Sequence, residues 1–187
     1  MGLKSPRSTI ILLVIAALTL VTDQFTKYLA ITRLAPIGVW APVPSLAHIF
    51  TFTYTTNTGV AFGLFKDLGP IFACVAVVVI AAIVIYQRQV PDGAWLVRVA
   101  LGLQLGGAAG NLIDRLRFDY AVVDFIHLHY YTPQLRLDWP VSNVADISIV
   151  VGVILLAFTM LREGKEPAKP APQASEFTDS NPSTLNL

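Results

Sequence analysis

The sequence predicts an integral membrane protein, mainly α-helical, built as a bundle of four transmembrane helices with a small extracytoplasmic β-sheet. Of its 187 residues, 55% are hydrophobic and only 13% are charged, whereas a soluble domain is about one quarter charged. Four stretches are apolar enough to cross a bilayer, and two others alternate polar and apolar residues as strands do. Residues 1–162 are expected to form one membrane-embedded domain.

The predicted spans cover about residues 9–30, 68–86, 94–113 and 144–161. The first begins with the apolar run "IILLVIAALTLV", which alone is too short to cross about 30 Å of hydrocarbon at about 1.5 Å per residue. It must therefore continue through Asp23 and Lys27. No small-x-small cleavage site follows, so we expect a retained helix rather than a removed signal peptide.

The third span carries glycines at every fourth position, Gly102, Gly106 and Gly110. Such a face of small residues lets a neighbouring helix approach closely. We expect it to bring the third helix against its neighbours and to do no chemistry itself.

Basic residues before the first span predict the orientation. Lys4 and Arg7 precede it with no acid nearby, which favours a cytoplasmic N-terminus. Four spans then return the C-terminus to the same side. Residues 163–187 are rich in Pro, Ala, Ser and charge, and they predict a disordered cytoplasmic tail.

Two outer stretches have the period of a strand. In "HIFTFTYTT" the aromatic residues alternate with threonines, and "FIHLHYY" could pair with "QLRLDW" across a turn at Thr132–Pro133. With Trp40 and Trp139 as interfacial aromatics, such a sheet could rest on lipid headgroups.

Composition excludes several classes of site. A net charge of +1 argues against a nucleic-acid partner, and the single cysteine, Cys74, excludes a disulfide framework. His127 and His129 share a strand face and could bind a metal ion, but a solvated pair is the simpler interpretation. We therefore expect neither a metal nor a cofactor.

Alternating helix directions bring the polar residues of the spans to one membrane face. The residues predicted to gather in this outer layer are Asp23, Asn111, Asp114, Asn143 and Asp146, with Asn57 and Asp124 in the adjoining outer connections. Because none of these acids lies in the middle of a span, a site at the interface is favoured over a pathway through the bilayer.

Two Asn-x-x-Asp pairs, Asn111 with Asp114 and Asn143 with Asp146, place an amide and a carboxylate on one helix face. Either pair alone could be a helix cap or an interhelical hydrogen bond. Two pairs at one depth favour a functional site, because each acid adds a desolvation cost.

The surroundings of the acids separate them by role. Asp23 has Lys27 at i+4 and is expected to be structural, while the charges of Arg115 and Arg117 should hold the pKa of Asp114 down. Asp124 and Asp146 have no basic neighbours in the sequence. If they face each other they would share one proton, so that one takes a proton from water while the other protonates a carbonyl oxygen.

Five motifs, "TDQFTKYL", "NTGVAFG", "GGAAGNLIDR", "VVDF" and "SNVAD", resemble in this order the bacterial lipoprotein signal peptidases (signal peptidase II), over about residues 8–162. The resemblance implies an inner-membrane aspartyl endopeptidase that removes the signal peptide before a diacylglyceryl-modified cysteine. Its catalytic pair would be Asp124 and Asp146. Supporting or substrate-binding positions would be Asn57, Gly107, Asn111, Asp114, Arg115 and Asn143.

The resemblance also implies a lipid-modified prolipoprotein and membrane lipids as partners of a monomer whose active site lies near the outer face. Two departures concern substrate preference: Ser142 stands where the family usually has an aromatic, and the stretch 125–141 is longer than is common.

Two other functions fit parts of the pattern. A small proton-coupled transporter could use Asp23, Asp114 and Asp146 as a relay, although it needs polar residues through mid-membrane, where Gln104 is the clear one in the third span. A non-catalytic assembly factor could use the glycine face for partners and the outer sheet for docking.

Overall fold

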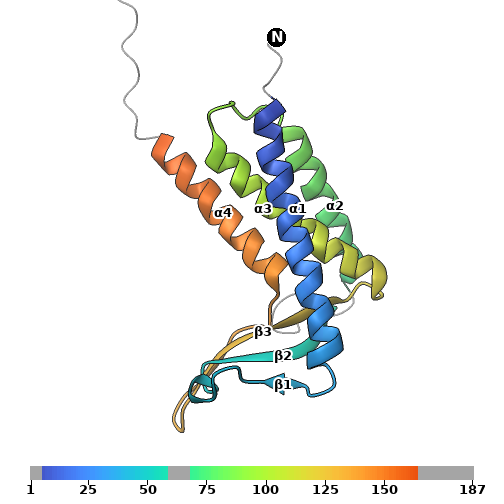
Figure 1. Ribbon diagram of the computed structural model, residues 1–187, viewed down its shortest axis with the longest axis vertical. Helices are drawn as coiled ribbons and strands as arrows, with labels where there is room; N and C mark the ends of the chain where they lie inside the picture. The colour runs from blue at the N-terminus through green and yellow to red at the C-terminus, as the bar shows by residue number, and fades with distance from the viewer. Residues whose placement is uncertain (1–5, 59–67, 164–187) are drawn as a thin grey trace, which may run out of the picture.

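The computed structural model describes residues 6–58 and 68–163, which form a helical bundle with a small sheet at one end (Figure 1). The four helices are α1 (Pro6–Leu29), α2 (Gly69–Tyr86), α3 (Trp95–Arg117) and α4 (Val144–Glu163). All four expected spans are present, as Thr9–Leu34, Gly69–Tyr86, Trp95–Arg117 and Val144–Arg162. The residues of the predicted disordered tail from 164 onward lie outside the described part.

Two spans are longer than the apolar pattern predicts. A π-helical turn, η1 (Ala30–Leu34), continues α1, and α3 runs on to Arg117 rather than ending near residue 113. In α3 the extension includes Asp114, which is buried and has Lys27 and Gln24 as partners, whereas the polar residues of η1 are exposed. Asp114 and Arg115 are therefore helical residues.

The sheet has four antiparallel strands in sequence order: β1 (Val39–Trp40), β2 (Phe50–Asn57), β3 (Val122–Tyr131) and β4 (Arg136–Asp138). A short 3₁₀ turn, η2 (Pro44–Leu46), lies between β1 and β2. The predicted strands and the hairpin of β3 with β4 are confirmed, whereas β1 was not predicted. In addition, β3 begins at Val122, earlier than its alternating pattern, and this places Asp124 within a strand.

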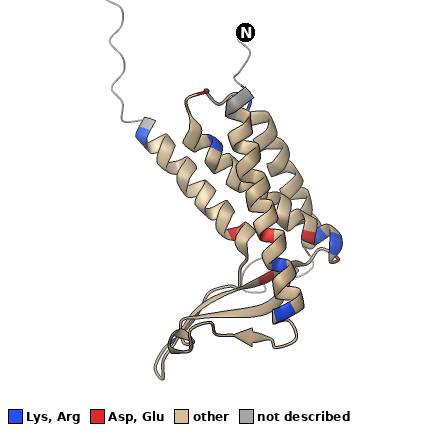
Figure 2. Cartoon of the chain, in the orientation of Figure 1, with Lys and Arg blue, Asp and Glu red and all other residues tan. Residues whose placement is uncertain are grey.

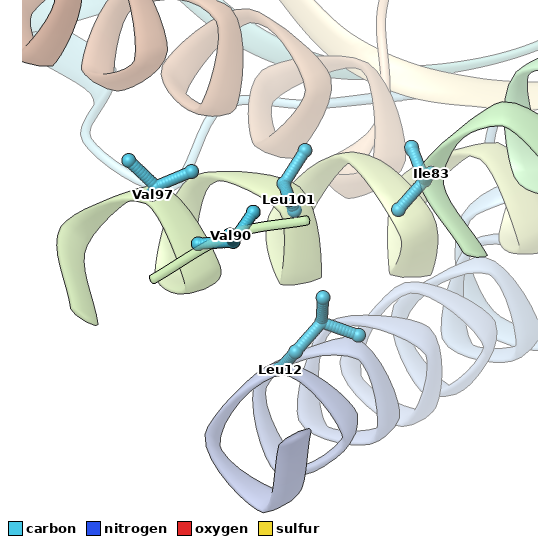
Figure 3. Close-up of a cluster of buried hydrophobic side chains, with 5 residues drawn as sticks. All are labelled: Leu12, Ile83, Val90, Val97 and Leu101. Atoms are coloured by element: carbon cyan, nitrogen blue, oxygen red, sulfur yellow. The ribbon is translucent and has the colours of Figure 1, made fainter. Parts of the chain in front are cut away.

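The end of the bundle opposite the sheet is closed by a small apolar cluster. Figure 3 shows its members, which come from three helices and the α2–α3 connection: Leu12, Ile83, Val90, Val97 and Leu101. Beside them Arg98 is 1% exposed and donates to the carbonyl of Val90 at 2.8 Å. This cluster joins α1, α2 and α3 where no catalytic residue is expected.

The glycine face of α3 packs against α1, as predicted. A β-carbon on Gly106 would lie 2.6 Å from both the carbonyl oxygen of Ala16 and Cβ of Thr19, and one on Gly102 would lie 2.8 Å from the carbonyl oxygen of Leu12. A β-carbon on Gly110 would meet the carboxylate of Asp23. The close approach therefore brings the polar residues of α1 into contact with α3.

Charged residues gather at the sheet end of the bundle (Figure 2). There the buried ammonium of Lys27 lies 2.9 Å from the carboxylate of Asp23, which is the predicted i,i+4 pair, and 3.0 Å from that of Asp114. Gln24, which sequence reasoning missed, donates to Asp114 at 3.1 Å and to the carbonyl of Gly110 at 3.2 Å. The sequence predicts that the charges of Arg115 and Arg117 act on Asp114; the ion pair with Lys27, on another helix, could not be read from that pattern.

A tight reversal leads from α3 to β3. Asp119 and Tyr120 have φ values of 50° and 65°, a left-handed conformation that non-glycine residues adopt only at some energetic cost. Gly69 at the start of α2 accommodates the reversal, because a β-carbon there would lie 2.5 Å from Cβ of Tyr120. The turn lets β3 start directly beneath the helix ends.

We predict that Gly106→Ala destabilises the protein by about 1–3 kcal/mol, because the added methyl overpacks the α1–α3 contact. Alanine would otherwise favour the helix by about 1 kcal/mol, so the sign of the change is informative. The melting temperature in detergent measures it. Gly93→Ala is the control, since nothing lies within 4 Å of the added carbon; an equal or smaller loss in Gly106→Ala would contradict close packing.

We also predict that Lys27→Met lowers the free energy of unfolding by about 3–5 kcal/mol, because it leaves two buried carboxylates without a counter-charge. Arg117→Met, at an exposed cation on the same end of the bundle, should change stability little. Denaturation of both variants in the same detergent measures the difference. Equal effects of the two substitutions would show that the buried cation does not stabilise the helix ends.

Candidate active site

The two aspartates expected to form the catalytic pair line one cavity at the junction of the bundle and the sheet. Asp124 comes from β3 and Asp146 from the first turn of α4. The cavity has a volume of about 270 Å³. Its walls also include Asn57, Phe72, Asn111, Arg115, Val122, Pro140, Val141 and Ser142.

Asn143 connects the two aspartates. Its side-chain nitrogen donates to Oδ1 of Asp124 at 2.7 Å, and its backbone N–H donates to Oδ2 of Asp146 at 3.3 Å. Asn143 is fully buried, so its position is set by the fold. One residue thus holds both carboxylates at the cavity.

Asn143 and Asp146 also form the N-terminal cap of α4. The side-chain oxygen of Asn143 accepts from the backbone N–H of Asp146 at 2.9 Å, and Asp146 returns a bond to the N–H of Asn143, which is the reciprocal capping box. Asp23 accepts from the N–H of Ala145 at 2.9 Å. The Asn-x-x-Asp spacing is therefore a cap, and it also positions Asp146 in the cavity.

Asn111 joins the ion cluster to Asp146. Its side-chain oxygen accepts from Lys27 at 2.9 Å and from Asn143 at 3.2 Å, while its nitrogen donates to Oδ1 of Asp146 at 2.7 Å. Because an ammonium group can only donate, Lys27 fixes which way the Asn111 amide points. In that orientation the side-chain nitrogen of Asn111 donates to Oδ1 of Asp146.

Asp124 is 2% exposed and has no basic partner within ion-pair distance among the described residues. Burial, followed by the negative charge of Asp146, raises the pKa of Asp124 to about 7. Hydrogen bonds from Asn143 and from Asn57, which donates at 3.2 Å, oppose that rise. Asp124 can therefore exchange a proton near neutral pH.

The rest of the "NTGVAFG" motif, residues 59–63, lies outside the described residues.

Arg115 lies along the wall of this cavity. Its guanidinium group is 5.8 Å from the centroid of the Phe72 ring and donates to the carbonyl of Asn111 at 3.2 Å. Its charge acts on Asp146, Asp124 and Asp114. Arg115 thus places a positive charge beside the paired acids without an ion pair to either of them.

Gly107 lets α4 reach this position. A β-carbon there would lie 2.5 Å from the carbonyl oxygen of Ala145 and 2.8 Å from the side chain of Ile149. Any larger residue would push the first turn of α4, and Asp146 with it, away from α3. Gly107 therefore supports the site through packing.

The structure brings the predicted site residues together in two layers. Asp124, Asp146, Asn57, Asn111 and Arg115 line the cavity, whereas Asp23, Lys27 and Asp114 form the ion cluster behind it. Gln24 follows Asp23 in "TDQFTKYL", and an amide inside an apolar span was the signal that could have identified it. Phe72 gave no signal, because it lies in a uniformly apolar stretch.

A second cavity of about 220 Å³ adjoins the first, since Phe72, Asn111 and Arg115 line both. It extends between α2, α3 and α4, where its walls are mostly apolar and Gln104 is the added polar residue. The polar cavity therefore adjoins a mostly apolar one.

The histidine pair lies away from these cavities. His127 is 2.9 Å from Asp138, and His129 is 2.9 Å from the carbonyl oxygen of Ala47. Over the described ranges no group of three or more His, Cys, Asp or Glu residues is arranged to hold a metal ion. These contacts tie β3 to β4 and to the segment before β2.

Two partly buried carboxyl groups facing one cavity, one of them with a pKa near 7, can act as a general acid and a general base. Neutral amides hold both groups, so neither carboxylate is neutralised by a direct ion pair within the described chain.

The sequence is similar to those of known membrane peptidases. The family model described as signal peptidase (SPase) II matches residues 15–162. The lipoprotein signal peptidase of Moorella thermoacetica is 42% identical over 159 residues, covering 83% of this chain and 98% of that protein. The one from Geobacter metallireducens is 38% identical over 159 residues, covering 83% and 93%.

Solved structures agree as well. A bacterial membrane enzyme determined by the in meso method at 2.3 Å resolution superposes with a TM-score of 0.73 at 28% identity, covering 90% of this chain and 96% of that one. A second such structure, at 1.9 Å resolution, gives a TM-score of 0.68, also at 28% identity. The sequence and structural matches together show that this chain belongs to the signal peptidase II family of aspartic membrane peptidases.

Proposed function

We propose that this protein cleaves the signal peptide from diacylglyceryl-modified prolipoproteins, just before the lipidated cysteine, with Asp124 and Asp146 as the catalytic pair. The observation that carries the proposal is that both carboxylates line one cavity and are linked through a single residue, Asn143. A volume of about 270 Å³ has room for a water molecule and a peptide carbonyl.

The two aspartates take different roles. Asp146 lies at the positive end of α4, where a negative charge is stabilised, and it acts as the base. Asp124, whose pKa is raised to about 7, carries the shared proton and acts as the acid. The helix N-terminus thus decides which member of the pair is charged.

The reaction then proceeds in two balanced steps. Asp146 takes a proton from water, the water oxygen bonds to the carbonyl carbon, and Asp124 gives its proton to the carbonyl oxygen. In the second step the C–N bond breaks: Asp146 returns its proton to the leaving nitrogen, and Asp124 recovers a proton from the hydroxyl that becomes the new carboxyl carbonyl. Both aspartates end in their starting protonation states.

The adjoining apolar cavity supports the choice of a lipid-modified substrate. An acyl chain between α2 and α4 would fix the modified cysteine at the membrane surface, and the peptide bond beside it would reach Asp124 and Asp146. Arg115 and Phe72, at the boundary of the two cavities, would contact the substrate where its lipid and peptide parts meet.

We infer that the active site faces the outside of a bacterial cytoplasmic membrane and that both termini are cytoplasmic. Lys4 and Arg7 support the position of the N-terminus. Helix α1 begins at the bundle end opposite the sheet (Figure 1). Since both aspartates come from one chain, a monomer over residues 1–162 would be a complete enzyme, and the proposed mechanism uses no cofactor.

Asp124→Asn and Asp146→Asn should each lower the cleavage rate of a lipid-modified prolipoprotein by about 10²–10⁴-fold or more, because each removes a proton-transfer group. A gel-shift assay of the precursor measures this with the enzyme in detergent or proteoliposomes. Asp138→Asn is the control, since that exposed acid belongs to the β3–β4 hairpin. Near-wild-type turnover by either site variant would remove that residue from the pair.

The raised pKa of Asp124 predicts a pH profile. Below about 7 the acid carries its proton; above that pH the proton is lost, and kcat/KM should fall about tenfold per pH unit. Asn57→Ala removes a hydrogen bond that lowers the pKa of Asp124, so it should move the alkaline limb to higher pH. A limb that stays in place, or moves down, would show that Asp124 is not the acid.

A further inference from the structure

A third cavity, which we name the rear cavity, lies on the opposite side of β3 from the catalytic site. It has a volume of about 410 Å³ and is enclosed by the outer end of α1, by η1 and by strands β1–β3. Successive side chains of a strand point to opposite faces: Asp124 lines the catalytic cavity and Phe125 lines this one. The strand that carries Asp124 is thus the wall between the two.

The rear cavity is apolar with one cationic residue. Leu29, Leu34, Phe52 and Phe125 contribute apolar walls. Among the described lining residues, the polar groups are the hydroxyl of Thr26, the guanidinium of Arg33 and the indole N–H of Trp40. The hydroxyl of Thr26 donates back to the carbonyl of Thr22 at 2.8 Å, so it offers no proton to a ligand. Arg33 is therefore the charged partner available to a ligand, with the indole N–H of Trp40 as a neutral donor beside it.

Arg33 has an exposed side chain, and no carboxylate of the described chain lies within ion-pair distance of it. A guanidinium group at the rim of an apolar cavity fits an anionic group attached to a hydrocarbon chain, and its planar donors match phosphate. The volume lies in the range of about 300–1,000 Å³ typical of small-molecule sites.

The position of the rear cavity identifies the source of such a ligand. Leu34 ends the first membrane span, so the cavity lies where hydrocarbon meets headgroups. Trp40 lines it and stacks on Phe52 at 5.7 Å, and tryptophan is enriched at that depth. Exposed Phe25 and Tyr28 on the same helix would face the acyl chains.

We propose that the rear cavity binds one glycerophospholipid of the outer leaflet, with its phosphate on Arg33 and an acyl chain against Leu34 and Phe125.

This lipid is not the substrate. The bond to be cleaved must reach the face of β3 that carries Asp124, whereas a ligand in the rear cavity contacts the other face. Its chain would extend the apolar cluster of Ala30, Leu34, Val123 and Phe125 behind the catalytic strand. The bound phospholipid would thus support the strand from which Asp124 projects.

Quenching of Trp40 fluorescence tests the proposal. Trp95→Phe with Trp139→Phe leaves Trp40 as the single tryptophan, since the chain has three. A phosphatidylglycerol carrying a nitroxide on one acyl chain is titrated into the purified protein in a phosphate-free maltoside detergent. The same titration with nitroxide-labelled diacylglycerol, which lacks the phosphate, measures the contribution of the hydrocarbon alone.

We expect saturable quenching at about one phospholipid per protein and a preference for phospholipid over diacylglycerol of about tenfold, the effect of one charge-assisted contact. Arg33→Gln should abolish that preference. Arg33→Lys should keep part of it, and Arg117→Gln, an exposed arginine outside the rear cavity, should keep all of it. Each preference is the ratio of the affinities for phospholipid and diacylglycerol, both measured on the same variant. A loss of folded protein lowers both signals and therefore does not change this ratio.

The proposal would be overturned by quenching that rises without saturation, by no preference in the protein with Arg33 intact, or by a preference that survives in Arg33→Gln. A synthetic signal peptide that displaces the labelled phospholipid in a one-to-one manner would assign the rear cavity to the substrate instead, and would equally overturn it.

Discussion

Lys27 is a cation buried within a layer of carboxylates, where it contacts Asp23, Asp114 and the amide oxygen of Asn111. Placing acids at the edge of hydrocarbon is expensive unless they are paired. The ammonium group offsets two of them directly. Through Asn111 it also acts on a third, because it forces the amide to present its nitrogen to Asp146. The rest of the site is arranged around this buried charge.

The two layers of acids have different chemistry because different groups hold them. In the inner layer a cation and backbone N–H groups contact Asp23 and Asp114, whose carboxylates connect α1, α3, β3 and α4. In the outer layer neutral amides contact Asp124 and Asp146. An amide orients a carboxylate without cancelling its charge. Burial therefore raises the pKa of Asp124, and repulsion from Asp146 adds to that rise.

Local pattern predicted the parts of this structure that depend on neighbours in the sequence. The four spans follow from length and hydropathy, the Asp23–Lys27 pair from i,i+4 spacing, and the close contact of α3 with α1 from its glycines. The gathering of Asp23, Asp114 and Asp146 at one end of the bundle follows from alternating helix directions. Each of these features can be predicted from the geometry of a helix and the thickness of a membrane.

Contacts between distant segments could not be predicted in the same way. The sequence places arginines beside Asp114, yet its partner Lys27 is on another helix. Asn143 could be identified as a capping residue, but its bond to Asp124 depends on how β3 packs against α4. Similarly, β1 is too short to show an alternating pattern, and it forms because its two residues pair with Phe52 and Thr53.

The short segment that leads into α4 links the strand of Asp124 to the helix of Asp146. The carbonyl oxygen of Ser142 accepts from the N–H groups of Phe125 at 2.9 Å and Ile126 at 2.8 Å, and its N–H donates to the carbonyl of Ile126 at 2.9 Å. One residue further along the chain, Asn143 begins the helix and bonds both aspartates. The backbone that pairs with the strand of Asp124 therefore continues directly into the cap that holds Asp146.

The side chain of Ser142 contributes little to this link, since its hydroxyl lies 3.5 Å from the carbonyl of Ile126. Because the main chain makes these bonds, the link between β3 and α4 depends little on which side chain stands at position 142.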